Sequence, residues 1–139
     1  MGTITFNTHD IKFDLRDKFY LKTFLTRVFA EEGVSFKSVS YIFCSDEFLL
    51  KLNKEYLNHD TYTDILTFTL SNSPLDIVSE IYISIQRVKE NAAELDVPFE
   101  NELHRVMIHG ILHLCGYEDK TQKQKSLMRV KEDHYLFLM

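Results

Sequence analysis

Hydrophobic and polar positions along the first part of the chain follow the periods of regular secondary structure. Residues 3–8 (TITFNT) alternate at period two, as a strand with one buried face does. Apolar residues then recur three and four positions apart from Leu21 to Phe29, which is the spacing of one face of an amphipathic helix. Gly33 follows where a helix C-terminal cap is expected. Residues 38–44 (SVSYIFC) alternate again and predict a second strand.

The middle of the chain predicts a helix and a pair of strands. Ser45 or Asp46 can cap the helix, because a short polar side chain accepts hydrogen bonds from free N–H groups at a helix start. Residues 64–70 (DILTFTL) and 79–85 (SEIYISI) are rich in β-branched and aromatic side chains. A turn expected at 71–74 (SNSP) connects them. Because this connection is short, the two strands should pair antiparallel.

Three further helices complete the pattern. They are predicted at 85–95, after a Ser84 cap, at 100–115 and at about 122–137. The resulting order, strand–helix–strand–helix–strand–strand–helix–helix–helix, is typical of an α+β fold. We therefore expect one domain over residues 1–139, with a small mixed β-sheet of about four strands packed with about five helices.

Composition and charge narrow the function classes. The chain has 139 residues, 45% of them hydrophobic, which is enough for one globular core. A net charge of −5 excludes the overall basic surface that many nucleic-acid-binding proteins carry. The segment 120–131 nevertheless holds five cations and no acid. This segment is either a solvated helix face or a local stripe that contacts phosphates.

Cysteine use and hydropathy indicate the compartment. Cys44 and Cys115 are too few for a disulfide framework, so we expect two reduced thiols. No apolar run approaches the ~20 residues that span a bilayer. The N-terminal residues lack the pattern of a secretory signal. Together these features predict a cytoplasmic protein with no membrane association.

Two histidines four residues apart mark the candidate chemistry. His109 and His113 lie on one face of the predicted helix, where they are either buried structural residues or two ligands of one metal ion. Gly116 ends the helix and lets the chain turn back, and Asp119 follows within three residues. Two histidines and one carboxylate are a common catalytic zinc set that leaves a position for water. Gly110 stands where an HExxH zinc peptidase has its glutamate base.

Three sequence blocks resemble one protein family. Residues 109–120 (HGILHLCGYEDK) resemble the signature His-Gly-x-Leu-His-Leu-x-Gly-Tyr-Asp-His of the YbeY family, bacterial single-strand-specific endoribonucleases that mature ribosomal RNA. Residues 52–68 (LNKEYLNHDTYTDILTF) resemble its block Leu-Asn-x-x-Tyr-Arg-x-x-Asp-x-Pro-Thr-Asp-Val-Leu-Ser-Phe. Residues 80–92 (EIYISIQRVKENA) resemble its Gly-Asp-Ile-x-Ile-Ser strand and following helix. The blocks keep the family's order and spacing over about residues 37–132.

The resemblance implies a ligand set and one change in it. The family's first two metal-binding histidines match His109 and His113, and its third histidine falls at Asp119. A carboxylate in place of an imidazole lowers the charge of the complex by one and is a harder donor. We expect one Zn²⁺ ion, with another divalent metal as the alternative.

A second departure concerns substrate binding. The family has an arginine, thought to contact RNA phosphate, where this chain has Leu57. Leucine cannot make the bidentate phosphate contact of a guanidinium, so other cations must supply it or phosphate binding is weaker. The candidate substrate-binding residues are Lys54, His59, Lys120 and Lys123.

The resulting hypothesis is metal-assisted cleavage of phosphodiesters in single-stranded ribosomal RNA, in rRNA maturation and ribosome quality control. The metal would polarise a phosphoryl oxygen or lower the pKa of a bound water, and Glu118 or Asp64 would assist proton transfer. In the plainer interpretation, Glu118 is an exposed turn acid and Asp64 a hydrogen-bonding residue at a strand start. The nucleophile, a metal hydroxide or a ribose 2′-OH, stays open. Expected partners are ribosomal particles, including the small subunit or assembly proteins.

Two alternatives come from other function classes. A non-catalytic ribosome-assembly or RNA-binding factor, in which a metal only fixes the last helix, is favoured by the missing arginine and the missing HExxH glutamate. A zincin-like metallopeptidase is disfavoured because Gly110 cannot act as its base.

Overall fold

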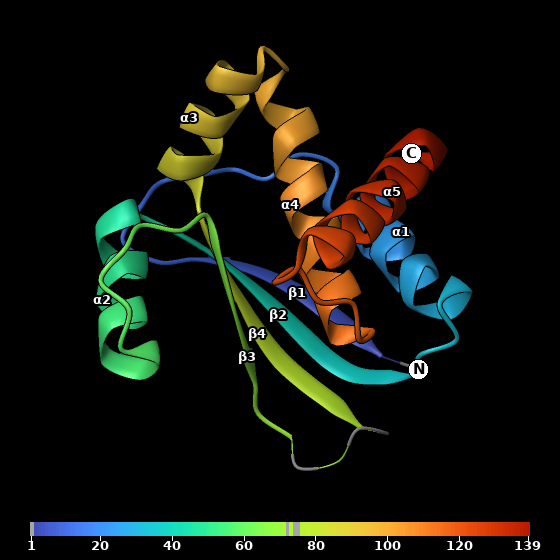
Figure 1. The fold of residues 1–139 in the computed structure, drawn as a ribbon. Helices are drawn as coiled ribbons and strands as arrows, with labels where there is room; N and C mark the ends of the chain where they lie inside the picture. The colour runs from blue at the N-terminus through green and yellow to red at the C-terminus, as the bar shows by residue number, and fades with distance from the viewer. Residues whose placement is uncertain (1, 72, 74–75) are drawn as a thin grey trace.

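The computed structural model describes residues 2–71, 73 and 76–139. Its elements follow the predicted order (Figure 1): β1 (Thr3–Thr8), α1 (Lys18–Glu31), β2 (Phe36–Cys44), α2 (Asp46–Leu57), β3 (Ile65–Thr69), β4 (Ile77–Ser84), α3 (Ile85–Leu95), α4 (Phe99–Leu114) and α5 (Gln122–Leu138). The α+β prediction is thereby confirmed. The turn expected at 71–74 includes residues outside the described part of the chain.

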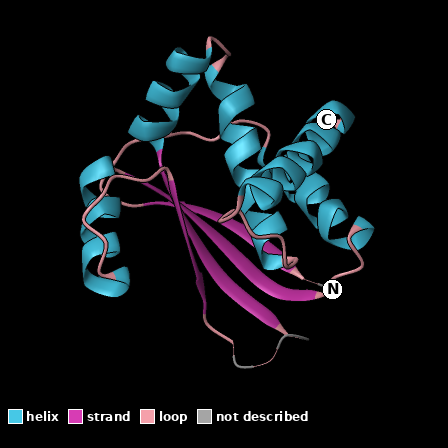
Figure 2. Cartoon of the chain, viewed as in Figure 1, coloured by secondary structure: helices cyan, strands magenta, loops and turns pink. Residues whose placement is uncertain are grey.

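The strands form one mixed sheet (Figure 2) in the order β1-β2-β4-β3. β1 pairs with β2, and β2 with β4, in parallel, whereas β3 pairs with β4 antiparallel, as the short connection predicts. A parallel neighbour needs a crossover, and α1 provides it between β1 and β2. In this strand order β3 lies at one edge of the sheet. It borders the face that carries α4.

The main core lies between one face of the sheet and α1 and α4, while α2 covers part of the opposite face (Figure 1). Val39, Tyr41 and Phe43 alternate along β2 and are fully or almost fully buried in this core. The Tyr41 hydroxyl donates a hydrogen bond of 2.6 Å to the Met107 carbonyl of α4. A Cβ at Gly110 would lie 3.0 Å from the Ile81 side chain, so the missing side chain lets α4 approach the sheet closely.

Polar residues predicted as caps delimit the helices. The Ser45 side chain accepts a hydrogen bond from the N–H of Phe48, and Ser84 does the same for Arg87. Gly33 has φ +71°, the left-handed conformation expected of a residue that follows a helix. Within the described residues, no helix combines the length and apolar character needed to cross a bilayer.

Candidate metal site

The three predicted ligands meet beside the C-terminal half of α4. His109 and His113 stand one turn apart, with ring centroids 5.5 Å from each other. The Nε2 atom of His109 lies 3.3 Å from one Asp119 carboxylate oxygen, and Nε2 of His113 lies 4.0 Å from the other. One ligand atom from each residue falls within 4.8 Å of the others. Three donors that converge in this way can share a single ion.

Hydrogen bonds at the far side of each ring favour the tautomer that ligation needs. Nδ1 of His113 lies 2.7 Å from the Tyr117 carbonyl, which can only accept, so Nδ1 carries the hydrogen. Nδ1 of His109 lies 2.7 Å from a Glu132 carboxylate oxygen, with the same consequence. In the neutral rings both Nε2 lone pairs are then free and directed toward Asp119. Such outer partners are usual for metal-binding histidines.

Glu132 of α5 supports the site from the core side. It is only 6% exposed, and its second carboxylate oxygen accepts a 3.0 Å hydrogen bond from Arg105 of α4. Burial lowers the pKa of His109, but the hydrogen bond and charge of Glu132, with the charges of Asp119 and Asp64, outweigh burial and raise it. The same negative charges that favour a proton on His109 also favour a divalent cation there.

The turn that carries Asp119 is held in place at its first two residues, Gly116 and Tyr117. Gly116 has φ +104°, a conformation that residues with a side chain rarely adopt. The Tyr117 hydroxyl donates a 2.7 Å hydrogen bond to Glu32 at the end of α1. Glu32 also accepts from the Lys131 ammonium and the Tyr135 hydroxyl of α5. The turn is thus tied to two helices, and this fixes the position of the third ligand.

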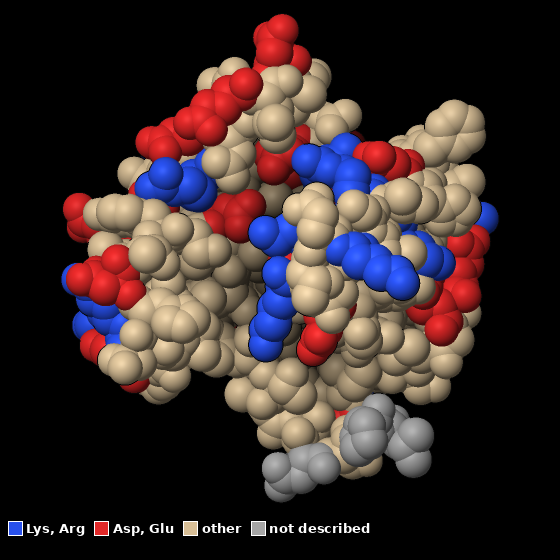
Figure 3. Space-filling model, viewed as in Figure 1, with Lys and Arg blue, Asp and Glu red and all other residues tan. Residues whose placement is uncertain are grey.

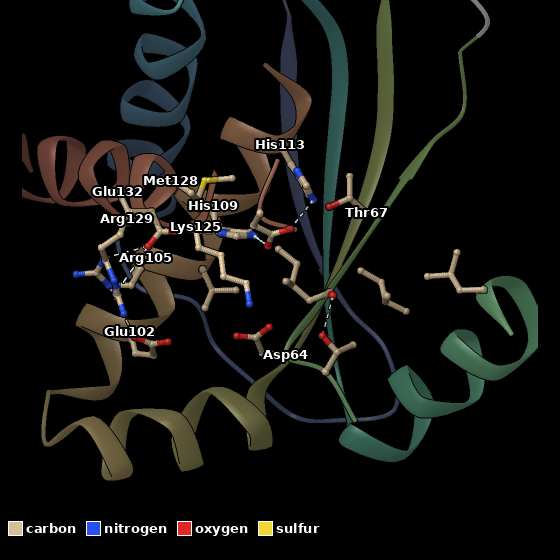
Figure 4. A pocket seen from close by; sticks show the side chains of 16 residues that line it. Asp64, Thr67, Glu102, Arg105, His109, His113, Lys125, Met128, Arg129 and Glu132 are labelled. Carbon is tan, nitrogen blue, oxygen red and sulfur yellow. Dashed lines mark hydrogen bonds and ion pairs between the residues drawn. The ribbon is translucent and has the colours of Figure 1, made fainter. Parts of the chain in front are cut away.

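A pocket of about 590 Å³ opens beside the three ligands. Figure 3 shows basic and acidic side chains around a hollow on this face. Residues of α2, β3, α4 and α5, with those of the loop before β3 and of the turn after α4, form its wall (Figure 4): Leu57, Thr63, Asp64, Ile65, Leu66, Thr67, Glu102, Arg105, Val106, His109, His113, Asp119, Lys125, Met128, Arg129 and Glu132.

Two carboxyl groups of the pocket wall have raised pKa values. Burial raises the pKa of Asp64, and the positive charge of His109 offsets this only in part. Asn91 donates a 3.3 Å hydrogen bond to the Asp64 carboxylate. Burial likewise raises the pKa of Glu102, whose Oε1 atom is buried without a hydrogen-bond partner among the described residues. Asp64, a proton-transfer residue predicted from its sequence block, lines the same pocket as the three predicted ligands.

The other predicted site residues lie elsewhere. Glu118 accepts a 3.2 Å hydrogen bond from Gln124. Lys54 forms a 3.2 Å ion pair with Asp60. In the part of the chain that the structure describes, the pocket wall includes neither these residues nor the predicted substrate-binding residues His59, Lys120 and Lys123.

Sequence reasoning missed the pocket residues Arg105 and Glu132, and it placed Lys125 and Arg129 only within the stripe 120–131. A signal for the α5 residues was present. Lys125, Arg129 and Glu132 are spaced three and four apart with Met128, which marks one helix face, and Met128 is buried. Arg105 gave a similar signal, because it stands four residues before His109 and eight before His113 on the same helix face.

The chain is similar to known proteins over most of its length. A family model described as Endoribonuclease YbeY matches residues 3–138. A protein named Endoribonuclease YbeY from Flavobacterium psychrophilum is 48% identical over 135 residues, which cover 97% of this chain and 95% of that protein. Another of the same name, from Cytophaga hutchinsonii, is 47% identical over 136 residues, covering 98% and 95%.

A solved structure has the same arrangement of elements. The solution structure of TM1509 from Thermotoga maritima aligns with a TM-score of 0.67 at 32% sequence identity. The alignment covers 96% of this chain and 86% of that one. The sheet and helices described above are therefore shared across nearly the whole chain.

Proposed function

Because the chain belongs to the endoribonuclease YbeY family, we propose that it is a metal-dependent endoribonuclease that cleaves single-stranded RNA in ribosomal RNA maturation and quality control. The observation that carries this proposal is the convergence of His109, His113 and Asp119 beside a pocket of about 590 Å³. Two imidazoles and a carboxylate that open onto a pocket are typical of hydrolytic metal enzymes.

The donor set fits one divalent ion. We expect zinc, with another divalent metal as the alternative because Asp119 is a harder donor than an imidazole. His109 and His113 would hold the ion through Nε2, and Asp119 through a carboxylate oxygen. When bound, such an ion supplies Lewis-acid chemistry and lowers the pKa of a bound water toward ~7. Glu132 and the Tyr117 carbonyl keep the two imidazoles in the ligating tautomer.

Proton transfer is assigned to Asp64. This residue lines the pocket, and its raised pKa brings it closer to neutral pH, where a carboxyl group exchanges protons more readily. Glu118 stays the second prediction, because its side chain bonds to Gln124 outside the pocket wall. A water molecule or the ribose 2′-OH can act as the nucleophile in this arrangement.

The substrate is proposed to be single-stranded rRNA, and the partners ribosomal particles, including the small subunit or assembly proteins. One domain over residues 1–139 would carry the whole activity. Outside the pocket, Lys54, His59, Lys120 and Lys123 stay predictions for contacts with more distant parts of the strand. Cys44 and Cys115 are both free cysteines, which suits action in the reducing cytoplasm.

A second candidate is a non-catalytic RNA-binding or ribosome-assembly factor that the metal only stabilises. Leu57 favours it, because this residue lines the pocket at the position where the family resemblance predicts a cation. A metallopeptidase is disfavoured by geometry. A Cβ at Gly110 would lie 3.0 Å from Ile81 and 3.1 Å from Ile65, so a glutamate base at this position would be directed into the packed sheet.

Incubating zinc-loaded protein with a single-stranded rRNA fragment tests the proposal. We expect cleavage by the wild type and by Lys51→Met, an exposed variant on α2 outside the pocket wall, and none by His113→Ala. Cleavage by His113→Ala at the wild-type rate would point to a contaminating nuclease and overturn the assignment. RNA binding without cleavage by the wild type, together with a lower melting temperature after chelation, would support the second candidate.

A further inference from the structure

The cationic side chains of the pocket wall differ in whether they form ion pairs with carboxylates. Arg105 lies 3.0 Å from Glu132 and 2.7 Å from Asp133. Arg129 lies 3.8 Å from the same Glu132. The Lys125 ammonium, in contrast, has no carboxylate of the described residues within 4.0 Å, and its side chain is exposed. Figure 4 shows Lys125 reaching from α5 into the pocket, with its ammonium on the side of Asp64.

The pocket wall has more acidic than basic side chains, so the unpaired Lys125 ammonium matters for binding a phosphate. Four carboxylates line the wall and outnumber the three Lys and Arg side chains: Asp64, Glu102, Asp119, Glu132 against Arg105, Lys125, Arg129. A polyanionic strand therefore meets an acidic wall, apart from the charge of a bound metal ion. On the opposite wall, Leu57 is 43% exposed and contributes no charge. The positive charge that is free to contact a phosphate lies on α5.

We propose that Lys125 binds a backbone phosphate of the RNA strand, adjacent to the phosphate that reaches His109, His113 and Asp119. The inference rests on the proposed function, since it names a substrate contact of the same site. A lysine ammonium contacts phosphate as a point charge, so the contact does not depend on the base sequence. An anionic group at this position would also pair the Lys125 ammonium, which has no carboxylate of the described residues within 4.0 Å.

Equilibrium binding tests the proposal. A fluorescently labelled single-stranded RNA is titrated with wild type, Lys125→Met and Lys51→Met, and anisotropy is followed at several salt concentrations. Lys51 of α2 is the control, because it is an exposed helical lysine that is neither in the pocket wall nor among the predicted RNA contacts. We expect Lys125→Met to weaken binding about tenfold at low salt. We also expect it to reduce the slope of log affinity against log salt by about 0.7, the value of one phosphate contact on a single strand.

Further variants and substrates identify the contact. Lys125→Arg should keep the wild-type salt slope, because the positive charge is retained. Single-stranded DNA of the same sequence should show the same Lys125 dependence, because phosphates are common to both strands. A Lys125→Met variant that binds like Lys51→Met overturns the inference, as does an effect confined to RNA or to one base sequence.

The same set of proteins separates this inference from the proposed function. If wild type cleaves RNA in a His113-dependent way but Lys125→Met binds normally, the phosphate contact is wrong and the nuclease assignment stands. If binding depends on Lys125 but the wild type does not cleave, the phosphate contact stands and the nuclease assignment is wrong. Thermal melting of each variant verifies that folding is unchanged.

Discussion

Glu132 accepts hydrogen bonds from two side chains. One carboxylate oxygen orients His109, and the other accepts from Arg105, so its charge serves a predicted metal ligand and a partly buried guanidinium together. Glu132→Gln keeps the shape of the side chain but removes its charge. The amide NH₂ group can only donate, so either His109 or Arg105 loses its acceptor. We expect zinc affinity to fall about 10–100-fold. Competition with a chelator of known affinity measures the loss.

Glu118→Gln is the matched control for this prediction. Its carboxylate is exposed and bonds only to Gln124 among the described residues, so zinc affinity should stay within about twofold. Unchanged affinity in Glu132→Gln would mean that the His109 ring is held by packing alone.

Asp64 is tested through rate and pH together. Asp64→Asn should lower kcat by about 10²–10⁴-fold at saturating zinc, because the amide cannot transfer a proton. Burial raises the pKa of Asp64, so the wild-type rate should rise with pH above the range of an ordinary carboxyl group, as the base form appears. That limb of the profile should be missing in Asp64→Asn. Asp60→Asn, at an exposed ion pair, should leave both rate and profile unchanged; a wild-type rate in Asp64→Asn would reject the assignment.

At the scale of elements, the turn after α4 decides where the third ligand lies. Gly116 and Gly33 both have positive φ, and an added Cβ at either would meet no atom within 4 Å. Alanine at each position should therefore lower the free energy of unfolding by a similar amount, about 1–2 kcal/mol, because only the backbone conformation is unfavourable for it. Only Gly116→Ala should also weaken zinc binding, by roughly tenfold, because it alone displaces Asp119. Denaturant unfolding and chelator competition measure the two effects, and equal zinc affinities in both variants would contradict this role of the turn.

The contact between α1, α5 and this turn depends on pH through Glu32. Burial raises the pKa of Glu32, but hydrogen bonds from Tyr135, Tyr117 and Lys131 lower it more, so the pKa lies below its ordinary value. A carboxyl group whose pKa falls on folding adds stability above its unfolded pKa, and this stability is lost as pH drops through the folded value. Glu32→Gln should cost about 1–3 kcal/mol at pH 7 and remove this part of the acid dependence. Urea unfolding at pH 7 and pH 4 measures both, and a variant with the full wild-type acid dependence would exclude Glu32 as its source.

The elements themselves were predictable, because local signals agree with the fold. Ser45 and Ser84 cap helices where the sequence places them, and the apolar period from Leu21 to Phe29 lies within α1. The position of the third predicted ligand was also foreseeable, since Asp119 follows Gly116 closely. Glu132 was not, because its contact with His109 joins residues 23 positions apart and depends on how α5 packs against α4. The spacing of residues along the sequence does not determine how two helices pack against each other.

At the scale of the whole molecule, metal binding and folding should be linked. α4 buries Met107, Ile108 and Ile111 in the main core and carries the two imidazoles on the side that lines the pocket. An ion held between α4 and the following turn binds only the folded chain, so about a hundredfold excess of zinc over its dissociation constant adds about 2.7 kcal/mol. We expect the melting temperature to rise on the order of 10 °C on zinc loading. Calorimetry with and without chelator measures this shift, and His113→Ala should lose most of it; an equal shift in that variant would place the ion elsewhere.

The position of α5 in the chain has a consequence for synthesis. Translation delivers the described elements from the N-terminal side, so α5 (Gln122–Leu138) emerges after the two imidazoles of α4. A nascent chain that ends before α5 carries His109 and His113 but neither Glu132 nor Lys125. With the roles proposed for these two residues, cleavage should start only once α5 has docked, so a ribosome that is still making the protein carries a chain whose pocket is incomplete.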